Sequence, residues 1–156
     1  QGRPLEHVPV DLAVVAADAV RDARAVDPHR PITATIDDAV TVTGDDGRLR
    51  QVVGNLVRNA LVHTPAPSPV DVRVARMNGH AVLEVRDEGP GMDPDVAAKA
   101  FERFYRADPA RTRRRGGGSG LGLAISRDLV RGMGGEIRAE SEPGRGSTFV
   151  ITLKRA

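Results

Sequence analysis

Two asparagines and a histidine recur four residues apart near the middle of the chain. Asn55, Asn59 and His63 fall along one line if the surrounding segment is helical. Asparagine carbonyl oxygens are hard ligands that can coordinate Mg²⁺, an ion that commonly bridges a protein to phosphates. The spacing therefore suggests a metal and phosphate edge, although two asparagines on a helix are more often ordinary surface residues.

A carboxylate followed by glycines stands directly after a predicted strand. Asp87 has the same parity as Leu83 and Val85, so its side chain should point inward, where an unpaired carboxylate is costly. The exocyclic amine of a purine could donate to it, and Gly89 and Gly91 would let the backbone approach a flat ring. An ordinary Asp-Gly turn at a strand end is the alternative.

A glycine-rich segment at residues 116–123, Gly-Gly-Gly-Ser-Gly-Leu-Gly-Leu, runs straight into a predicted helix. Glycines allow successive N–H groups to turn inward, and a helix N-terminus favours negative charge, so this pattern is typical of a phosphate cradle. It lacks the Gly-Lys-Ser/Thr of a P-loop and does not complete a βαβ unit. A flexible linker is the alternative reading.

Hydrophobic periodicity predicts helices around these segments. Apolar residues at spacings of three and four mark a helix from Asp45 or Asp46, as its N-cap, to about residue 61. Other helices are expected over residues 10–26 and 93–100, and from Ser119, as a possible cap, to about Met133. Residues 108–118 have no apolar periodicity and are predicted to form a loop.

Alternating and β-branched segments predict the strands. Residues 32–36 and 40–43 are expected to form a small hairpin or meander, and residues 136–141 and 148–153 the last two strands. Strands near residues 70–74 and 81–85 flank Asn78-Gly79, the two-residue signal of a type I′ hairpin. Strands and helices do not alternate strictly, so we predict an α+β fold: a mixed sheet with helices on one face.

Composition restricts the possible functions. The chain has 156 residues, a length typical of one domain, and a formal net charge of +2 with 3% aromatic residues and no cysteine. Near-neutral charge and few stacking rings argue against a nucleic-acid binder. The absence of cysteine excludes disulfides and thiolate chemistry. No apolar run approaches the roughly 20 residues of a membrane-spanning helix.

Taken in order, these segments resemble the ATP-binding catalytic domain of sensor histidine kinases, within the superfamily that includes gyrase, ATPase chaperones and mismatch-repair ATPases. The resemblance covers nearly the whole chain. It is carried by five motifs: an N box at residues 49–60, a first glycine box at 87–91, an F box at 101–105, a second glycine box at 118–123 and a final glycine turn at 144–148.

The resemblance implies a two-layer α/β sandwich of the Bergerat type, with mostly antiparallel strands and about three helices on one face, over residues 1–156. It implies ATP and Mg²⁺ as cofactors, Asn59 and Asn55 as metal ligands, and Asn55 and Arg103 as catalytic residues. The implied nucleotide site comprises Asn55, Asn59, His63, Asp87, Gly89, Gly91, Met92, Tyr105, Gly118, Ser119, Gly120, Leu121, Gly122, Leu123 and Thr148.

Individual roles also follow from the resemblance. Asp87 would hold the adenine amine, Thr148 would support Asp87 or its water, and residues 94–117 would form a lid over ATP. Val62 departs from the family, because many relatives carry a basic residue there toward phosphate. The arginine-rich stretch 103–115 could replace that contact, although such a run is commonly a solvated loop.

The resemblance implies partners as well. None of the four histidines lies in a sequence like the family's phosphoacceptor box, so the acceptor is expected on a separate dimerisation domain of the same kinase. A response regulator would then receive the phosphate from the acceptor histidine. The isolated domain is expected to be monomeric. The full-length kinase is expected to be a homodimer anchored in the cell membrane, with this domain on its cytoplasmic face and no nucleic-acid partner.

Three other functions compete with a histidine kinase. A regulatory module could hold ATP without transferring phosphate, and Val62 is its one supporting feature. An anti-sigma-factor serine kinase is the closest enzyme, but the F box opposes it. Binding of nucleic acid by the arginine run would be dependent on salt and indifferent to ATP.

Overall fold

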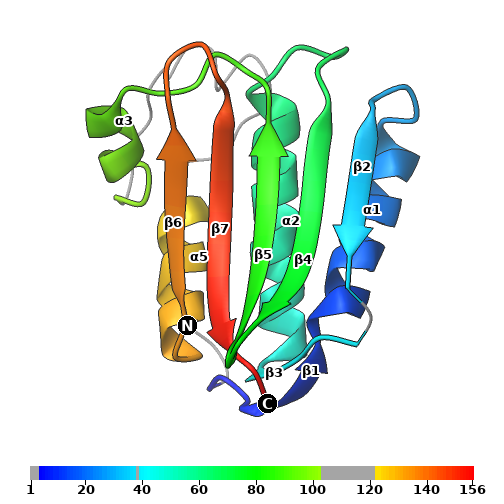
Figure 1. Ribbon diagram of the computed structural model, residues 1–156, viewed down its shortest axis with the longest axis vertical. Helices are drawn as coiled ribbons and strands as arrows, with labels where there is room; N and C mark the ends of the chain where they lie inside the picture. The colour runs from blue at the N-terminus through cyan, green and yellow to red at the C-terminus, as the bar shows by residue number, and fades with distance from the viewer. Residues whose placement is uncertain (1–3, 38, 103–121) are drawn as a thin grey trace.

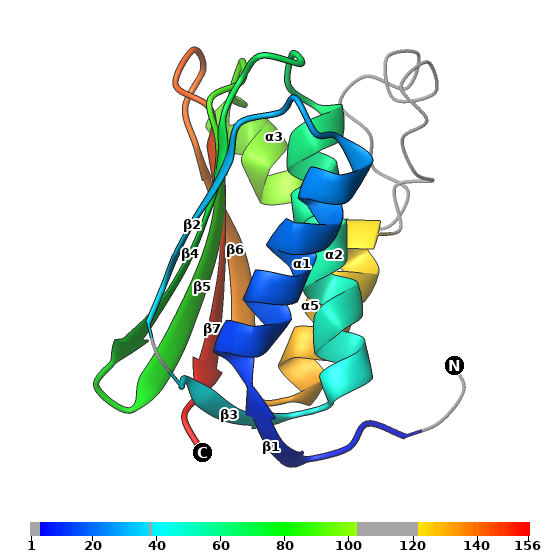
Figure 2. The same cartoon turned by 90° about the vertical axis from the view of Figure 1, so that its right-hand side faces the viewer.

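The computed structural model describes residues 4–37, 39–102 and 122–156. They form a five-stranded sheet in the order β2-β4-β5-β7-β6, whose one face carries the long helices, and a separate two-stranded sheet of β1 and β3 (Figure 2). Only β2 and β4 pair in parallel, so the sheet is mixed and mostly antiparallel. The predicted α+β sandwich is confirmed.

The sheet strands are β2 (Ile32–Ile36), β4 (Val70–Met77), β5 (His80–Asp87), β6 (Glu136–Ser141) and β7 (Ser147–Lys154) (Figure 1). The helices are α1 (Leu12–Val26), α2 (Asp46–Val62), α3 (Pro94–Lys99) and α5 (Gly122–Gly132). The small sheet consists of β1 (Val8–Asp11) and β3 (Thr41–Gly44). Boundaries agree with the sequence prediction to within a few residues.

Local side-chain chemistry explains where the first two helices begin. The Asp11 carboxylate accepts from the Ala13 N–H at 3.0 Å, which starts α1 two residues later than predicted. Asp45, which is fully buried, accepts from the Arg48 N–H at 3.1 Å and from the Glu6 N–H at 2.9 Å. Asp45 is therefore the N-cap of α2 and also holds the N-terminal segment.

The prediction that residues 32–36 and 40–43 pair as a hairpin or meander is wrong. β2 instead pairs in parallel with β4, and β3 pairs antiparallel with β1 in the other sheet. The β1 strand was not predicted, because Pro9 interrupts its pattern. The hairpin of β4 and β5 is confirmed, but Asn78 alone in its loop has positive φ (52°), whereas type I′ requires it at both loop residues.

The core lies between the sheet and helices α1, α2 and α5. Leu49, Val52 and Leu56 on α2 are fully buried, as are Leu83 on β5 and Ile151 on β7.

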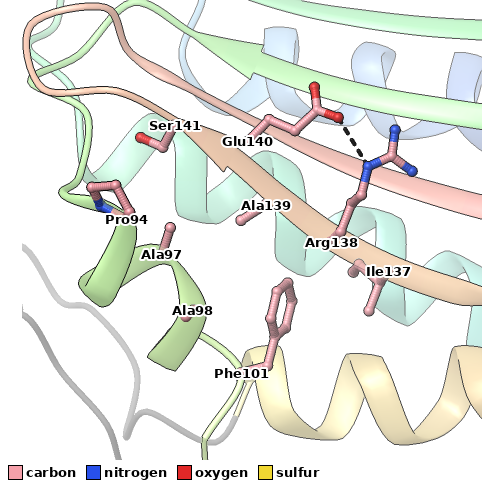
Figure 3. A pocket seen from close by; sticks show the side chains of 9 residues that line it. All are labelled: Pro94, Ala97, Ala98, Phe101, Ile137, Arg138, Ala139, Glu140 and Ser141. Carbon is pink, nitrogen blue, oxygen red and sulfur yellow. Dashed lines mark hydrogen bonds and ion pairs between the residues drawn. The ribbon is translucent and has the colours of Figure 1, made fainter.

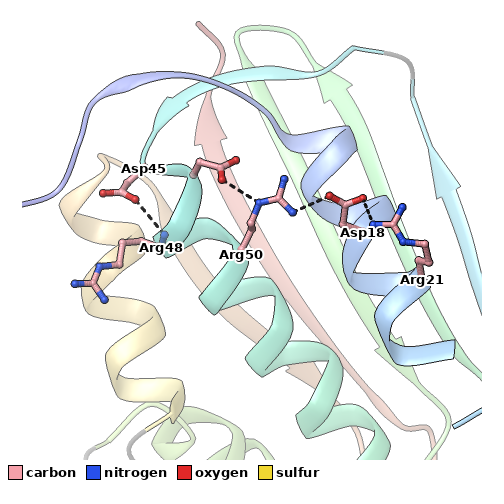
Figure 4. Close-up of polar contacts among 6 residues, drawn as sticks. Asp18, Arg21, Asp45, Arg48 and Arg50 are labelled. Atoms are coloured by element: carbon pink, nitrogen blue, oxygen red, sulfur yellow. Dashed lines mark hydrogen bonds and ion pairs between the residues drawn. The ribbon is translucent and has the colours of Figure 1, made fainter. Parts of the chain in front are cut away.

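At the surface, Arg50 of α2 bridges Asp46 and Asp18, and Arg21 also contacts Asp18 (Figure 4). The hydrogen bond from Arg50 lowers the pKa of Asp18, and exposure of these groups keeps the stabilisation small.

Candidate functional site

Asp87 is the last residue of β5, and its side chain points into the protein, with 6% of its surface exposed. Its Oδ1 accepts from the backbone N–H of Gly89 at 2.9 Å and of Ser147 at 3.2 Å. No residue in the described part of the chain donates a hydrogen bond to Oδ2. The inward direction predicted from strand parity is confirmed, and one oxygen is left able to accept from a ligand.

The surroundings of Asp87 act on the pKa of its carboxyl group in both directions. Burial raises the pKa of Asp87 above its usual value. The two backbone donors lower this pKa, and so do the charges of His63 and Arg30, but burial has the larger effect. The side chain therefore resembles the perturbed acids found at binding and catalytic sites, where a donor from a ligand would relieve the cost of burial.

Two glycine turns lock together beside Asp87. A Cβ at Gly91, where φ is +74°, would lie 1.9 Å from the Glu142 carbonyl oxygen, and one at Gly146, where φ is +81°, would lie 2.1 Å from the Asp87 carbonyl oxygen. The Gly144 N–H donates to the Pro90 carbonyl at 2.6 Å. The packing of the two turns thus requires glycine at position 91, whether or not the backbone there approaches a nucleobase.

The prediction that Thr148 supports Asp87 is wrong by one residue. On β7, Thr148 stands opposite Arg86 and Ser147 stands opposite Asp87, so Thr148 faces the other side of the sheet. Ser147 is buried and donates to Asp87 through its backbone. The signal that could have found it is the inward alternation of residues 147, 149, 151 and 153.

The end of α2 reaches the same place. His63 is its C-cap residue, and a Cβ at Gly89 would lie 3.5 Å from the His63 carbonyl oxygen and 2.7 Å from the Cγ2 of Thr64. His63, Asn59 and Asn55 then follow down one edge of α2, and all three are partly buried. From His63 to Asn55 this edge is about 12 Å long along the helix axis.

Asn55 connects this edge to the start of α5. Its Nδ2 lies 3.5 Å from Ser126 Oγ on α5, and a Cβ at Gly122 would lie 4.0 Å from the same nitrogen. Its Oδ1 accepts from Arg58 at 3.0 Å. The structure therefore brings Asp87, the asparagine edge and Gly122 into one continuous region, whose helices lie side by side in both views (Figures 1 and 2).

The remaining predicted residues are distributed as follows. Met92 is partly buried and donates its N–H to Ser141 Oγ at 2.8 Å, and Leu123 packs against the core. Other predicted site residues lie outside the described residues, namely Arg103, Tyr105, Gly118, Ser119, Gly120 and Leu121. The predicted loop at residues 108–118 and most of the predicted lid lie there too.

Phe101 fixes the start of the F box in the core. Its ring meets Phe149 of β7 edge-on, with centroids 6.0 Å apart, and the Arg127 guanidinium of α5 lies 5.6 Å from its centre. A separate hollow of about 460 Å³ lies between α3 and β6 and includes Phe101 in its lining (Figure 3). It contains none of the predicted nucleotide residues.

The described residues contain neither a cluster of metal-ligating side chains nor a membrane-spanning helix. Within residues 4–37, 39–102 and 122–156, no three His, Cys, Asp or Glu side chains gather as a metal site. No helix in these ranges is long and apolar enough to cross a membrane.

Comparison with known proteins identifies relatives of this arrangement. Residues 44–156 match the family of histidine kinase-, DNA gyrase B- and HSP90-like ATPases. Probable sensor histidine kinase TcrY of Mycobacterium tuberculosis is 43% identical over 153 residues, covering 97% of this chain and 32% of the relative. Signal transduction histidine-protein kinase AfsQ2 of Streptomyces coelicolor is 40% identical over 141 residues, covering 90% and 24%. The chain thus spans a minor part of these relatives.

Solved structures agree. A solved chain of the mycobacterial sensor histidine kinase MprB superposes with a TM-score of 0.83 and 32% identity, covering 96% of this chain and 97% of that solved chain. Full-length ShkA in complex with AMPPNP also gives 0.83, at 30% identity, covering 100% of this chain and 32% of ShkA. The chain therefore belongs to the histidine kinase-, DNA gyrase B- and HSP90-like ATPases, as an ATP-binding catalytic domain of the sensor histidine kinase type.

Proposed function

We propose that residues 1–156 form one catalytic domain that binds MgATP and donates its γ-phosphate to a histidine on a separate dimerisation domain. A response regulator would receive the phosphate afterwards. The observation that carries this proposal is the buried Asp87, whose Oδ1 is held by two backbone N–H groups while Oδ2 is available to an exocyclic amine. Adenine offers such an amine.

The asparagine edge of α2 would hold the metal and phosphates. Asn59 can supply an amide oxygen to Mg²⁺, and Asn55 can do so when its Oδ1 exchanges the Arg58 guanidinium for the metal. When bound, Mg²⁺ would neutralise phosphate charge. Asn55 lies close to Gly122 and thus to the start of α5, where backbone N–H groups favour an anion. Arg58, one helical turn before Val62, brings a guanidinium to Asn55 and so adds positive charge near the departure from the family pattern.

The roles of the remaining residues are part of the same proposal. Gly118, Gly120 and Gly122 would surround the phosphates, and Arg103 would face the γ-phosphate or the acceptor. Phosphoryl transfer needs mainly positioning and charge neutralisation, which these groups provide without a covalent residue on the domain. In the full-length protein we propose a membrane-anchored homodimer with this domain on the cytoplasmic side.

The proposal is tested by mixing the domain with the dimerisation domain of the same kinase and ATP labelled on its γ-phosphate. We expect acid-labile label on the acceptor histidine, and none with the Asp87→Asn variant. ATP binding without any transfer would instead support a regulatory module. Base-labile phosphoserine on a protein substrate would support the serine-kinase alternative.

A further inference from the structure

Arg30 is a buried cation just before β2 that belongs to none of the five motifs. It is 6% exposed, and it donates to three acceptors in the last turn of α2 and the segment that leads from α2 to β4. Its Nε donates to the Ser68 carbonyl at 2.7 Å and one terminal nitrogen to the Leu61 carbonyl at 3.3 Å. The other donates to the hydroxyl of Thr64. A planar guanidinium can hold three such acceptors at once.

Thr64 passes this constraint to the nucleotide site. It is 1% exposed, and its hydroxyl accepts from Arg30 and donates to the Ala60 carbonyl at 2.7 Å. Its methyl group faces Gly89 so closely that a Cβ there would lie 2.7 Å from it. The Thr64 rotamer and the position of the Gly89 backbone are therefore interdependent.

Gly89 in turn donates its N–H to Asp87 Oδ1 at 2.9 Å. We propose that Arg30 is a positioning residue for nucleobase recognition: it fixes the turn after α2 against Gly89, so that Asp87 keeps Oδ1 on the backbone and presents Oδ2 to an amine. The role deepens the proposed function and rests on it. It predicts that Arg30 contributes to discrimination between adenine, with a 6-amine, and guanine, with a 6-carbonyl.

Charge supports the same role. The charged and titratable groups that act on Asp87 from neighbouring elements are His63, at the end of α2, and Arg30, before β2. Both lower the pKa of Asp87 against the effect of burial. Arg30 therefore also helps to keep the carboxylate in the form that accepts from an amine.

Three variants separate geometry from charge. Arg30→Met removes both the bonds and the charge. Thr64→Val keeps the charge and the methyl group that faces Gly89, but it removes the hydroxyl. Arg24→Met is the matched control, because Arg24 also donates to a backbone carbonyl at this strand, that of Ile32 at 3.1 and 2.6 Å, and has no described contact with the turn after α2.

Two measurements are made on each folded variant: the pH midpoint of the Asp87 carboxyl by carbon NMR without nucleotide, and the Kd values of MgATP and MgGTP. Arg30→Met should raise the pH midpoint of Asp87 and increase the Kd of MgATP about tenfold, the equivalent of one lost hydrogen bond. It should also reduce the preference for MgATP over MgGTP, measured as the ratio of their Kd values. Thr64→Val should weaken MgATP and leave the midpoint near that of the wild type. Arg24→Met should change neither.

A folded Arg30→Met variant that behaves like Arg24→Met overturns the proposal. If Arg30→Met does not fold, Thr64→Val with wild-type affinity for MgATP overturns it instead. Failure of the proposed function looks different: the wild-type domain would then not bind MgATP. The NMR midpoints would still report whether Arg30 acts on Asp87.

Discussion

Asp87 is deeply buried, and within the described part of the chain its hydrogen-bond donors lie at Oδ1 alone. Burying a carboxylate is unfavourable unless hydrogen bonds compensate, and here Gly89 and Ser147 compensate through Oδ1. A ligand amine at Oδ2 would complete this compensation. Recognition of this kind is selective, because a base with a carbonyl at the same position would place two acceptors together.

The raised pKa of Asp87 gives a stability prediction. Between the unfolded pKa, about 3.9, and the raised native pKa, the folded protein binds more protons than the unfolded chain, so stability falls as pH rises. Without nucleotide, we expect the free energy of unfolding of Asp87→Asn relative to wild type to increase as pH rises through this window, then level off.

Urea denaturation of both proteins, at each pH where both are folded, measures this difference. Asp18 should affect stability in the opposite direction to Asp87, because the hydrogen bond from Arg50 lowers the pKa of Asp18. Its contribution is therefore lost as pH falls. A difference between Asp87→Asn and wild type that shrank toward neutral pH would contradict the assigned direction at Asp87.

For single residues, the sequence predicts side-chain direction wherever strand alternation applies. Parity placed Asp87 inside, and the buried side chain confirms it. The prediction that Thr148 supports Asp87 is wrong because a sequence motif does not contain the strand register. That register puts Ser147 opposite Asp87. No sequence pattern indicates the role of Arg30 and Thr64, because it depends on a contact between distant segments. The two residues are 34 positions apart in the chain.

The two interlocking turns after β5 and before β7 determine the position of Asp87. Gly91→Ala should be strongly destabilising, because the new Cβ meets the Glu142 carbonyl oxygen and the residue has positive φ. Gly134→Ala is the control: its φ is +83° and its surroundings are open. We expect about 1 kcal/mol of strain for Gly134→Ala and at least about 2 kcal/mol more for Gly91→Ala.

Thermal or urea unfolding of the two variants compares these costs, and equal losses of stability would argue that the turns are not closely packed. The Gly91→Ala variant should also lose nucleotide affinity, since the turn that it displaces contacts Asp87. Gly134, which follows α5 at the other end of that helix from Gly122, should not affect binding.

The elements themselves were largely predictable, but their pairing was not. Periodicity predicts α2 because apolar spacing is a local property, and of the two predicted caps, Asp45 and Asp46, the structure selects Asp45. The partner of β2 is β4, which lies beyond α2 in the sequence, so no local pattern could distinguish this parallel pairing from a hairpin. The β1 strand was missed because Pro9 fits only an edge position.

The proposed site forms where the ends of β5 and α2 and the beginning of β7 meet at one end of the domain (Figure 1). Each element contributes one part, so the site requires the complete fold. Nucleotide bound there should stabilise the native state, by about 2.7 kcal/mol at a hundredfold excess over Kd.

Removing Mg²⁺ tests the asparagine edge separately from the adenine contact. We expect EDTA to weaken ATP binding to the wild type, and Asn59→Ala to weaken MgATP binding while making it less sensitive to EDTA. Gln51→Ala, at an exposed residue of the same helix, should leave both unchanged. Equal EDTA sensitivity in Asn59→Ala and wild type would assign the metal to other ligands.

The most direct test is a calorimetric titration of the wild-type domain and of Asp87→Asn with MgATP, with circular dichroism to confirm that both are folded. We predict saturable binding to the wild type and the loss of most of that affinity in the variant. Unchanged MgATP affinity in a folded Asp87→Asn domain would contradict the central claim that this carboxylate holds the nucleobase.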